Sequence, residues 1–299
     1  MNLYLFESGS SKTSVYLFSL KGDKEVLKEY VLPGYNPNRP NTDFEEHLQS
    51  FLFDPNDCIR FYGSGLGSID NKEKVKALFS EVGVENSVVF DDITGAARAL
   101  YGKENGLLAI MGTGGCAGYF NGVEIKYRRG GHGYLINDLG GGYELGKRIV
   151  SGWLNNDFNT EVTAKIEAHF GTSSQAFTTN YYYEFNNGQE TAALASVASV
   201  VEIIAPYQNQ PAVKAVIENY FDHFFRSEIL PLVEKTGNNE LRLIGSIAQN
   251  FTEIIFELAC THKINLTKIL RYPALNLLSF HQEEIFNTEK KDKTAEIRK

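Results

Sequence analysis

The chain has 299 residues, which exceeds one average domain and fits two domains of roughly 100–150 residues each. Its net charge of −8 argues against a nucleic-acid partner, because such a partner needs a basic face. The three cysteines, Cys58, Cys116 and Cys260, lie far apart without CxxC spacing, so no disulfide framework, zinc site or iron–sulfur site is expected, and a reducing cytoplasm is favoured.

The first 105 residues predict a mixed sheet with helices on its faces, which we take as an N-terminal domain (residues 1–105). The predicted elements are, in chain order, strands over 3–6, 15–20 and 25–31, a helix over 44–53, a strand over 58–62, a helix over 71–82 with Asn71 as N-cap, a strand over 87–90 and a helix over 94–101.

Residues 106–274 are predicted as a C-terminal domain that begins with the same order of strands. The predicted elements are strands over 106–111, 117–120 and 123–127, helices over 143–154, 161–170, 191–204 and 211–235, a strand over 241–244, a helix over 252–262 and a strand over 266–270. A loop of small residues joins the first two strands in each half, so the pattern indicates an internal duplication.

The N-terminus lacks a basic segment followed by an apolar one, and no window is expected to be long and apolar enough to span a membrane. We therefore expect a cytoplasmic protein without a membrane partner. The last residues, 288–299, are mostly polar and are expected to form a solvated tail.

The two loops of small residues could each hold phosphate groups, because glycine lets the backbone approach closely and short hydroxyls and a cation add donors. The first is Gly9-Ser10-Ser11-Lys12-Thr13, and the second is Gly112-Thr113-Gly114-Gly115. Either could equally be a polar hairpin turn. Their equivalent places in the two halves favour phosphate binding.

Several polar residues stand where an acceptor substrate could meet them. Asp91 and Asp92 follow a strand and precede a helix, where a carboxylate can accept a hydroxyl proton or can cap the helix. Asp138 and Asn36 could bind substrate hydroxyls or could simply stabilise turns. His132 lies in a glycine-dense stretch between such candidates.

Residues Gly63–Gly67 are similar to a dinucleotide-binding fingerprint, but their spacing is GxGxG instead of GxGxxG. They make a nicotinamide oxidoreductase one hypothesis for the function of the chain. The remaining histidines show no metal-binding spacing and are expected to be surface or packing residues.

The motifs together resemble the BadF/BadG-type ATPases and the N-acetylglucosamine kinases of the actin/Hsp70/sugar-kinase superfamily. They are, in order, ESGSSKT (7–13), DITGAA (92–97), GTGG (112–115), GGHG with NDLG (130–140) and GSIA (245–248). The resemblance runs from about residue 3 to residue 278. It implies two ribonuclease-H-like, actin-like ATPase domains of class α/β, each a mixed five-stranded sheet flanked by helices, with ATP and Mg²⁺ in a cleft between them. It also implies a final helix, about 275–287, that returns to the first domain.

The resemblance assigns roles to particular residues. The phosphate-binding residues would be Gly9, Ser10, Ser11, Lys12, Thr13, Gly112, Thr113, Gly114 and Gly115. The adenosine motif would be Gly245 and Ser246, the general base Asp92, and the Mg²⁺ residue Glu7, acting through water. The sugar-binding residues would be Asn36, Gly131, His132 and Asp138. The implied activity is ATP-dependent phosphorylation of a small sugar, most simply an amino sugar such as N-acetylglucosamine.

The sequence departs from the family pattern at several positions. Glu7 stands where aspartate is common, Leu139 replaces a glutamate, and His132 replaces a tryptophan that could pack against the sugar. These changes leave open a second function, a catalytically weak or inactive sensor of nucleotide or sugar. Cys116 and Cys260 do not reproduce the cluster-binding cysteines of the dehydratase activators, so that branch is rejected. The sequence does not determine the oligomeric state, and a homodimer is one of the alternatives.

Overall fold

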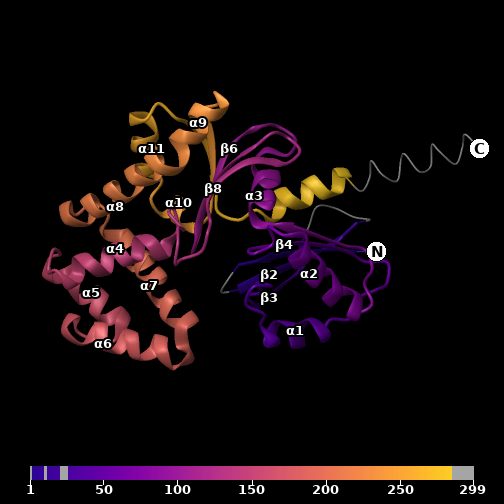
Figure 1. The fold of residues 1–299 in the computed structure, drawn as a ribbon, viewed down its shortest axis with the longest axis horizontal. Helices are drawn as coiled ribbons and strands as arrows, with labels where there is room; N and C mark the ends of the chain where they lie inside the picture. The colour runs from indigo at the N-terminus through magenta and orange to yellow at the C-terminus, as the bar shows by residue number, and fades with distance from the viewer. Residues whose placement is uncertain (1, 10–11, 21–25, 285–299) are drawn as a thin grey trace, which may run out of the picture. The chain divides into compact units, whose positions relative to one another are not determined.

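The computed structural model of the chain describes residues 2–9, 12–20 and 26–284. The chain forms two compact units. Unit 1 comprises the described parts of residues 1–102 and 272–299, and unit 2 comprises residues 103–271. Each unit contains one mixed five-stranded sheet with helices packed on it, which confirms the predicted α/β class (Figure 1).

The elements of unit 1 are β1 (Asn2–Ser8), β2 (Lys12–Ser19), β3 (Val26–Pro33), α1 (Thr42–Gln49), β4 (Cys58–Gly63), α2 (Ile69–Glu81), β5 (Ser87–Asp91), α3 (Asp92–Tyr101) and a helix described over residues 274–284. The strand order is β3-β2-β1-β4-β5. Strands β1, β4 and β5 are parallel, with Ser8 opposite Gly63 and Gly63 opposite Asp91. The carboxyl ends of these three strands therefore lie at one edge of the sheet.

The two faces of this sheet carry different helices because successive strand residues point to opposite sides. Phe6 packs against Phe79 of α2, and its neighbour Phe61 packs against Phe44 of α1. Tyr62 points to the other face, where its ring lies against Gly95 of α3. Helices α1 and α2 thus cover one face, and α3 and the 274–284 helix cover the other (Figure 1).

The predicted bounds need corrections in unit 1. Helix α1 ends at Gln49 instead of residue 53. Helix α2 begins at Ile69, and its N-cap is Ser68 instead of Asn71, because the Ser68 hydroxyl accepts the N–H of Asn71. The side-chain amide of Asn71 instead donates to the carbonyl of Gly65. The last three positions of the predicted 275–287 helix lie outside the described residues.

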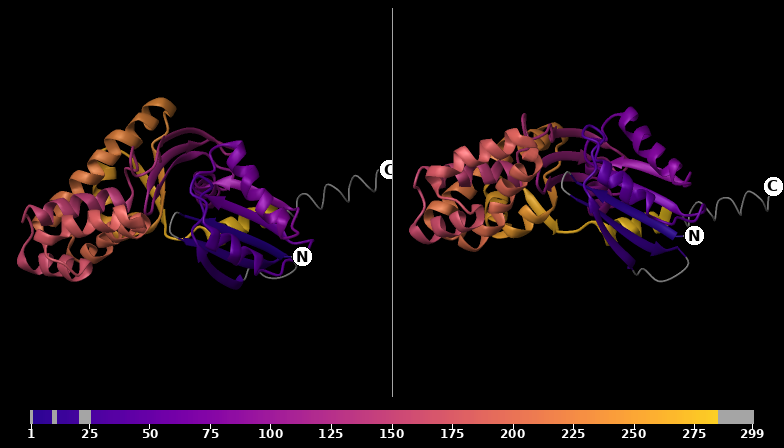
Figure 2. Two further views of the ribbon diagram at one scale, coloured as in Figure 1. Left: turned by 60° about the horizontal axis from the view of Figure 1, so that its bottom comes forward. Right: turned by 90° about the horizontal axis from the view of Figure 1, so that it is seen from below.

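The strands of unit 2 are β6 (Gly106–Met111), β7 (Gly115–Phe120), β8 (Ile125–Gly130), β9 (Glu240–Ile244) and β10 (Asn265–Leu270). Its helices are α4 (Gly142–Leu154), α5 (Thr160–Phe170), α6 (Ser174–Glu184), η1 (Phe185–Gln189), α7 (Glu190–Ile204), η2 (Ala205–Tyr207), α8 (Pro211–Phe224), η3 (Phe225–Ile229), α9 (Leu230–Thr236), α10 (Ser246–Asn250) and α11 (Thr252–Thr261). Both views of Figure 2 show the pink and orange helices gathered as one group in this unit.

The strand order of unit 2 is β8-β7-β6-β9-β10, which matches the order of unit 1 strand for strand. The repeat that the sequence indicated is therefore present in the topology. The core of unit 2 contains Trp153 of α4, Phe221 of α8 and Leu243 of β9, all essentially inaccessible to solvent. This core fixes α4 against the sheet, with its first turn beside the loop between β6 and β7.

Helix α6 was not predicted. Its sequence, SQAFTTNYYYE, has no apolar periodicity, and only Phe177 is buried in it. The expectation that no window is long and apolar enough to span a membrane is also wrong. By length and composition alone, the helical stretch Thr160–Tyr207 contains one such window. That stretch is divided by left-handed backbone at Gly171 and by a kink at Gly188, and α7 buries Val197 and Val200 in the core of unit 2.

Candidate functional site

The carboxyl edge of the unit 1 sheet gathers every described site residue that the sequence predicted in this unit. These are Glu7, Gly9, Lys12, Thr13, Asn36 and Asp92, which lie at the ends of β1, β3 and β5, at the start of β2, or just beyond. Two further predicted phosphate residues, Ser10 and Ser11, lie outside the described residues.

The loop between β1 and β2 is fixed by hydroxyl groups. The Ser8 and Thr13 hydroxyl oxygens are 2.7 Å apart, and Thr13 Oγ1 lies 3.0 Å from the carbonyl oxygen of Pro33, to which it can donate. The N–H of Gly9 donates to the carbonyl of Lys12. Thr13 is fully buried, whereas the Lys12 side chain is exposed. Thr13 therefore ties the start of β2 to the ends of β1 and β3, and Lys12 is the exposed cation beside it.

Glu7 is the unusual carboxylate of this edge. Its Oε1 atom is buried and has no hydrogen-bond partner among the described residues. The pKa of the Glu7 carboxyl is raised from its ordinary value of 4.5 to about 8, mainly by burial and also by the charge of Glu29, while Lys12 opposes the shift. A buried unpaired oxygen costs free energy unless a ligand, ion or water completes it.

These features fit a Mg²⁺ ion held through water, because Mg²⁺ takes oxygen ligands and keeps several waters. Within the described part of the chain, no group of three or more histidine, cysteine, aspartate or glutamate residues is placed to hold a metal ion. Glu7 would be one carboxylate partner of such a hydrated ion.

Asp91 and Asp92 have different partners at the start of α3. Asp91 is the N-cap, and its carboxylate accepts the N–H of Thr94 at 3.1 Å. Asp92 is the first helical residue, and its carboxylate accepts the N–H of Ile93 at 2.8 Å. Both side chains are half-buried. The capping role therefore belongs to Asp91, while Asp92 lies in the first turn of the helix, beside the positive end of the helix dipole.

Asn36 packs directly against the glycine-rich turn after β4. Gly65 has φ of +76°, and a Cβ placed there would lie 2.2 Å from Asn36 Oδ1. The same Oδ1 accepts the N–H of Asn38. The GxGxG spacing over residues 63–67 is thus explained by a tight turn beside Asn36. The hydroxyl of Ser64 in this turn is a second buried group without a hydrogen-bond partner among the described residues.

In unit 2, the predicted phosphate loop 112–115 and the loop 138–142 touch backbone to backbone. A Cβ on Gly115 would lie 2.4 Å from the carbonyl oxygen of Leu139, and one on Gly141 would lie 2.5 Å from the carbonyl carbon of Gly114. A Cβ on Gly114 would lie 2.9 Å from Asp138 Oδ2. Side chains would separate these loops, so the glycines are required for their contact.

The start of α4 and the turn after β9 complete this arrangement. The N–H of Gly142 donates to the carbonyl of Gly112, and the N–H of Tyr143 donates to the carbonyl of Thr113. Gly245 has φ of +125°, and a Cβ there would lie 2.3 Å from the carbonyl oxygen of Met111. The structure thus brings together the predicted phosphate residues Gly112–Gly115, Asp138, and the predicted adenosine residues Gly245 and Ser246 at the carboxyl end of β6.

The loop that carries Gly131, His132 and Asp138 is closed by its own hydrogen bonds. Asp138 Oδ1 accepts the N–H of Gly133 at 3.0 Å, and the N–H of His132 donates to the carbonyl of Asn137. Burial raises the pKa of Asp138, and the Gly133 N–H partly opposes that shift. The His132 side chain is exposed. Leu139, by contrast, is buried in the core, so this departure from the family pattern contributes packing.

Two buried residues that the sequence did not point to hold this loop from behind. The Tyr220 hydroxyl accepts the N–H of Gly140 at 2.8 Å and donates to the carbonyl of Gly141 at 2.7 Å. Glu228, in the π-helical turn η3, accepts the side-chain amide of Asn137 and pairs with Arg129. The sequence feature that could have revealed Glu228 is a glutamate within the apolar run of α8 and α9, because a charge is rarely buried without a partner.

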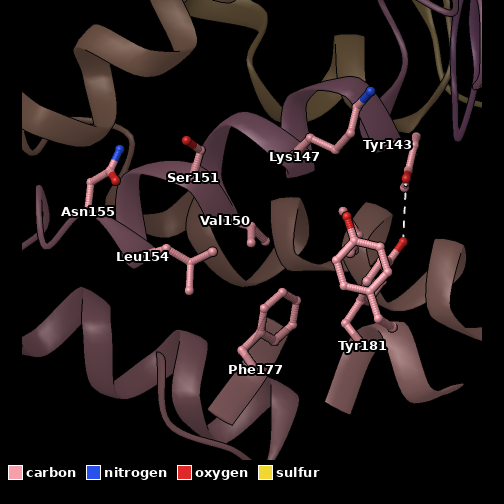
Figure 3. Close-up of a pocket in the computed structure, with 10 residues that line it drawn as sticks. Tyr143, Lys147, Val150, Ser151, Leu154, Asn155, Phe177 and Tyr181 are labelled. Carbon is pink, nitrogen blue, oxygen red and sulfur yellow. Dashed lines mark hydrogen bonds between the residues drawn. The ribbon is translucent and has the colours of Figure 1, made fainter. Parts of the chain in front are cut away.

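A separate pocket of about 330 Å³ runs along α4, α6 and α7. Its lining residues are Tyr143, Lys147, Val150, Ser151, Leu154, Asn155, Phe177, Tyr181, Tyr182 and Val197. Figure 3 shows Phe177 and Tyr181 facing α4, with the Tyr181 hydroxyl 3.4 Å from that of Tyr143. None of the residues predicted to bind nucleotide or sugar lines it.

Solved structures share this fold. A protein from Porphyromonas gingivalis, solved as a candidate N-acetylglucosamine kinase, matches with a TM-score of 0.82 and 22% identity over 94% of this chain and 99% of its own. A second candidate N-acetylglucosamine kinase, from Chromobacterium violaceum, matches with a TM-score of 0.66 and 16% identity over 93% and 98%. A ROK family glucokinase from Streptomyces griseus, solved with glucose and AMPPNP, matches with a TM-score of 0.50 and 12% identity over 94% and 98%.

No protein-family model matches the chain, and no curated protein does. The structural similarity extends along nearly the whole length of each of these proteins and includes both sheets. The chain therefore shares the fold of the two structures solved as candidate N-acetylglucosamine kinases.

Proposed function

We propose that the chain is an ATP-dependent kinase of a small sugar, and that an amino sugar such as N-acetylglucosamine is its first substrate to test. The observation that carries this proposal is the convergence of loop 112–115, loop 138–142 and Gly245 at the end of β6. Glycines packed backbone against backbone leave little room for side chains, which suits a surface that a phosphate chain approaches closely.

In this proposal, unit 2 holds the nucleotide. The exposed hydroxyl of Thr113 and the glycine backbone on either side of it would meet the phosphates, and Gly245 with Ser246 would meet the adenosine. Tyr220 keeps the neighbouring loop rigid, because it bonds both Gly140 and Gly141. Donors that are already ordered lose little entropy when charge develops on the transferred phosphoryl group.

Unit 1 would supply the reacting side chains. Asp92 would accept the proton of the sugar hydroxyl as that oxygen attacks the γ-phosphorus of ATP and ADP leaves. Lys12 would bind phosphate oxygens. When bound, Mg²⁺ would neutralise charge on the phosphates, and Glu7 would hold one of its waters.

The predicted sugar-binding residues Asn36 and Asp138 would contact substrate hydroxyls. Asn36 is fixed by Gly65 and Asn38, and Asp138 by the N–H of Gly133, so each keeps a defined orientation without substrate. The Gly131–Gly133 turn would lie beside the sugar, with His132 in the place of a flat aromatic side chain. Similarity to candidate N-acetylglucosamine kinases supports an amino sugar as substrate.

Purified protein with ATP, Mg²⁺ and a panel of hexoses, hexosamines and N-acetylhexosamines tests the proposal. We expect one class of sugar to stimulate ADP release and to gain one phosphoryl group by mass spectrometry. Absence of stimulation by every sugar in the panel would contradict the sugar kinase. Calorimetric binding of ATP and sugar without ADP formation would instead favour a sensor.

A further inference from the structure

A buried chain of hydrogen bonds connects α3, β4 and the 274–284 helix within unit 1. Arg98 Nη1 donates to the Tyr62 hydroxyl at 3.0 Å, and that hydroxyl lies 2.8 Å from Nε2 of His281. His281 Nδ1 lies 2.9 Å from Glu284 Oε2. Because the Glu284 carboxylate only accepts, the Nδ1 proton of His281 is directed to it, and Nε2 of the neutral ring is left to accept the Tyr62 proton.

The middle of this chain is neutral and its ends are charged. Burial raises the pKa of Tyr62 to about 12, and burial lowers the pKa of His281, against the opposing effect of Glu284. Arg60 and Arg98 are the cations that face the two groups. His281 is fully buried. A satisfied network of this kind fixes the orientation of its members, because each lost bond would leave a buried polar atom unpaired.

The ring of Tyr62 lies directly under the first turn of α3. A Cβ on Gly95 would lie 2.7 Å from Tyr62 Cδ1, so the helix backbone rests on the ring. The ring is also stacked on Phe90, its β5 neighbour, with centroids 5.0 Å apart. The Arg98 guanidinium lies 3.9 Å from the centroid of Phe90. Gly95 follows Asp92 by three residues, so the ring supports the turn that carries Asp92.

We propose that Tyr62, held by Arg98 and His281, is a positioning residue for Asp92 and that the C-terminal helix thereby takes part in setting the geometry of the reaction. This inference rests on the proposed function of Asp92 as general base. Rate depends steeply on the position of such a group, since a shift of about 1 Å can cost roughly 100-fold. A purely structural role, in which the network only anchors the 274–284 helix, makes a different prediction for kcat.

Four substitutions test the network, and a fifth serves as a matched control. Tyr62→Phe keeps the ring and removes the hydroxyl. Gly95→Ala forces α3 away from the ring. His281→Leu removes the partner of the hydroxyl, whereas His281→Gln keeps a polar atom near the position of Nε2. The control is Tyr4→Phe, which removes a hydroxyl from β1 near the amino edge of the same sheet, where Tyr4 lies opposite Ile59.

We expect Tyr62→Phe, Gly95→Ala and His281→Leu to lower kcat roughly tenfold with KM for ATP and sugar unchanged within about twofold. His281→Gln should restore most of the loss, and Tyr4→Phe should leave kcat unchanged. The positioning role would be overturned if Tyr62→Phe and Gly95→Ala kept kcat within about twofold of wild type. In that case any fall in their melting temperatures would reflect a structural role alone.

A second measurement does not depend on kinase activity. The ¹³C resonance of the Asp92 carboxyl, followed by NMR during a pH titration, should move in Tyr62→Phe and stay unchanged in Tyr4→Phe. If the wild type phosphorylates no sugar but this shift appears, the proposed function fails and the positioning role stands. If the titration curve is identical in wild type and Tyr62→Phe, the positioning role fails whatever the activity.

Discussion

The two sheets share one strand order but build their first loops in different ways. In unit 1 the loop between β1 and β2 is held by the side-chain hydroxyls of Ser8 and Thr13, and the buried carboxylate of Glu7 stands at its base. In unit 2 the loop between β6 and β7 is held by backbone, with Gly115 against Leu139 and Gly142 bonded to Gly112. Equivalent places in a repeated fold thus carry different chemistry.

The two repeats therefore differ in the chemical groups that they supply. Unit 1 gathers the ionisable groups Glu7, Lys12 and Asp92 at the ends of its strands, whereas unit 2 presents glycine backbone and the carboxylate of Asp138. Proton transfer and charge compensation need side chains, and close approach to a phosphate chain needs their absence. Substitutions in unit 1 should therefore reduce turnover, while substitutions in the unit 2 loops should reduce folding and nucleotide binding.

The largest effect is expected for Asp92→Asn. It should lower kcat at least about 100-fold while the Kd for ATP stays nearly unchanged, because the general base is lost and the nucleotide contacts remain. Steady-state ADP release and calorimetry measure the two quantities. Asp91→Asn is the matched control, since asparagine caps a helix as well as aspartate. Equal losses in both variants would contradict the assignment of the base to Asp92, because Asp91→Asn keeps both the helix cap and the Asp92 carboxylate.

The backbone contact in unit 2 is tested by Gly115→Ala. Its Cβ would fall 2.4 Å from Leu139 O, so the loops must separate, and we expect a loss of about 3 kcal/mol or more of unfolding free energy together with weaker ATP binding. Gly112→Ala is the control, because the nearest atom to its Cβ would be 3.9 Å away. Similar denaturant midpoints for the two variants would contradict the proposed role of close packing.

Tyr220→Phe tests the support of the same loop. Loss of the hydroxyl leaves the N–H of Gly140 and the carbonyl of Gly141 buried without this partner, which should cost about 1–2 kcal/mol of unfolding free energy. Urea denaturation monitored by fluorescence gives the value. An unchanged midpoint would show that other groups or water take over both bonds.

The last prediction concerns Glu7 and the dependence of stability on pH. Its carboxyl has an ordinary pKa of 4.5 and a folded-state pKa of about 8, so between these values the folded state holds a proton that the unfolded state has lost. The contribution of Glu7 to stability is therefore complete below pH 4.5 and declines as the pH rises to about 8. Relative to wild type, Glu7→Gln should gain stability across this range. The raised pKa would be contradicted if the difference in melting temperature between Glu7→Gln and wild type were the same at pH 5, 7 and 9.

Much of the fold followed from local patterns. Alternating strands and small-residue loops predicted both sheets, and the parallel strands β1, β4 and β5 place Ser8, Gly63 and Asp91 level with one another. What could not be predicted depends on contacts between distant residues. Tyr62 and His281 are 219 positions apart, and a histidine without a motif gives no sign of such a partner.

Prediction of the candidate site from sequence meets the same limit. The glycines of loops 112–115 and 138–142 were recognised as unusual, but their mutual packing is visible only in three dimensions. Helix α6 lacks the periodicity that would reveal it, because its only buried residue is Phe177. Tyr220 and Glu228 lie in helices whose apolar pattern predicts core, and their polar atoms turn out to hold the loop.

Product analysis tests the central claim most directly. Wild-type protein incubated with ATP, Mg²⁺ and N-acetylglucosamine, with N-acetylmannosamine and glucose in parallel, should form one sugar phosphate for each ADP, detected by mass spectrometry and by ³¹P NMR. Asp92→Asn under the same conditions should form neither above background. ADP that accumulates at the same rate with and without every sugar, or a sugar phosphate that forms equally fast in Asp92→Asn, would contradict the account.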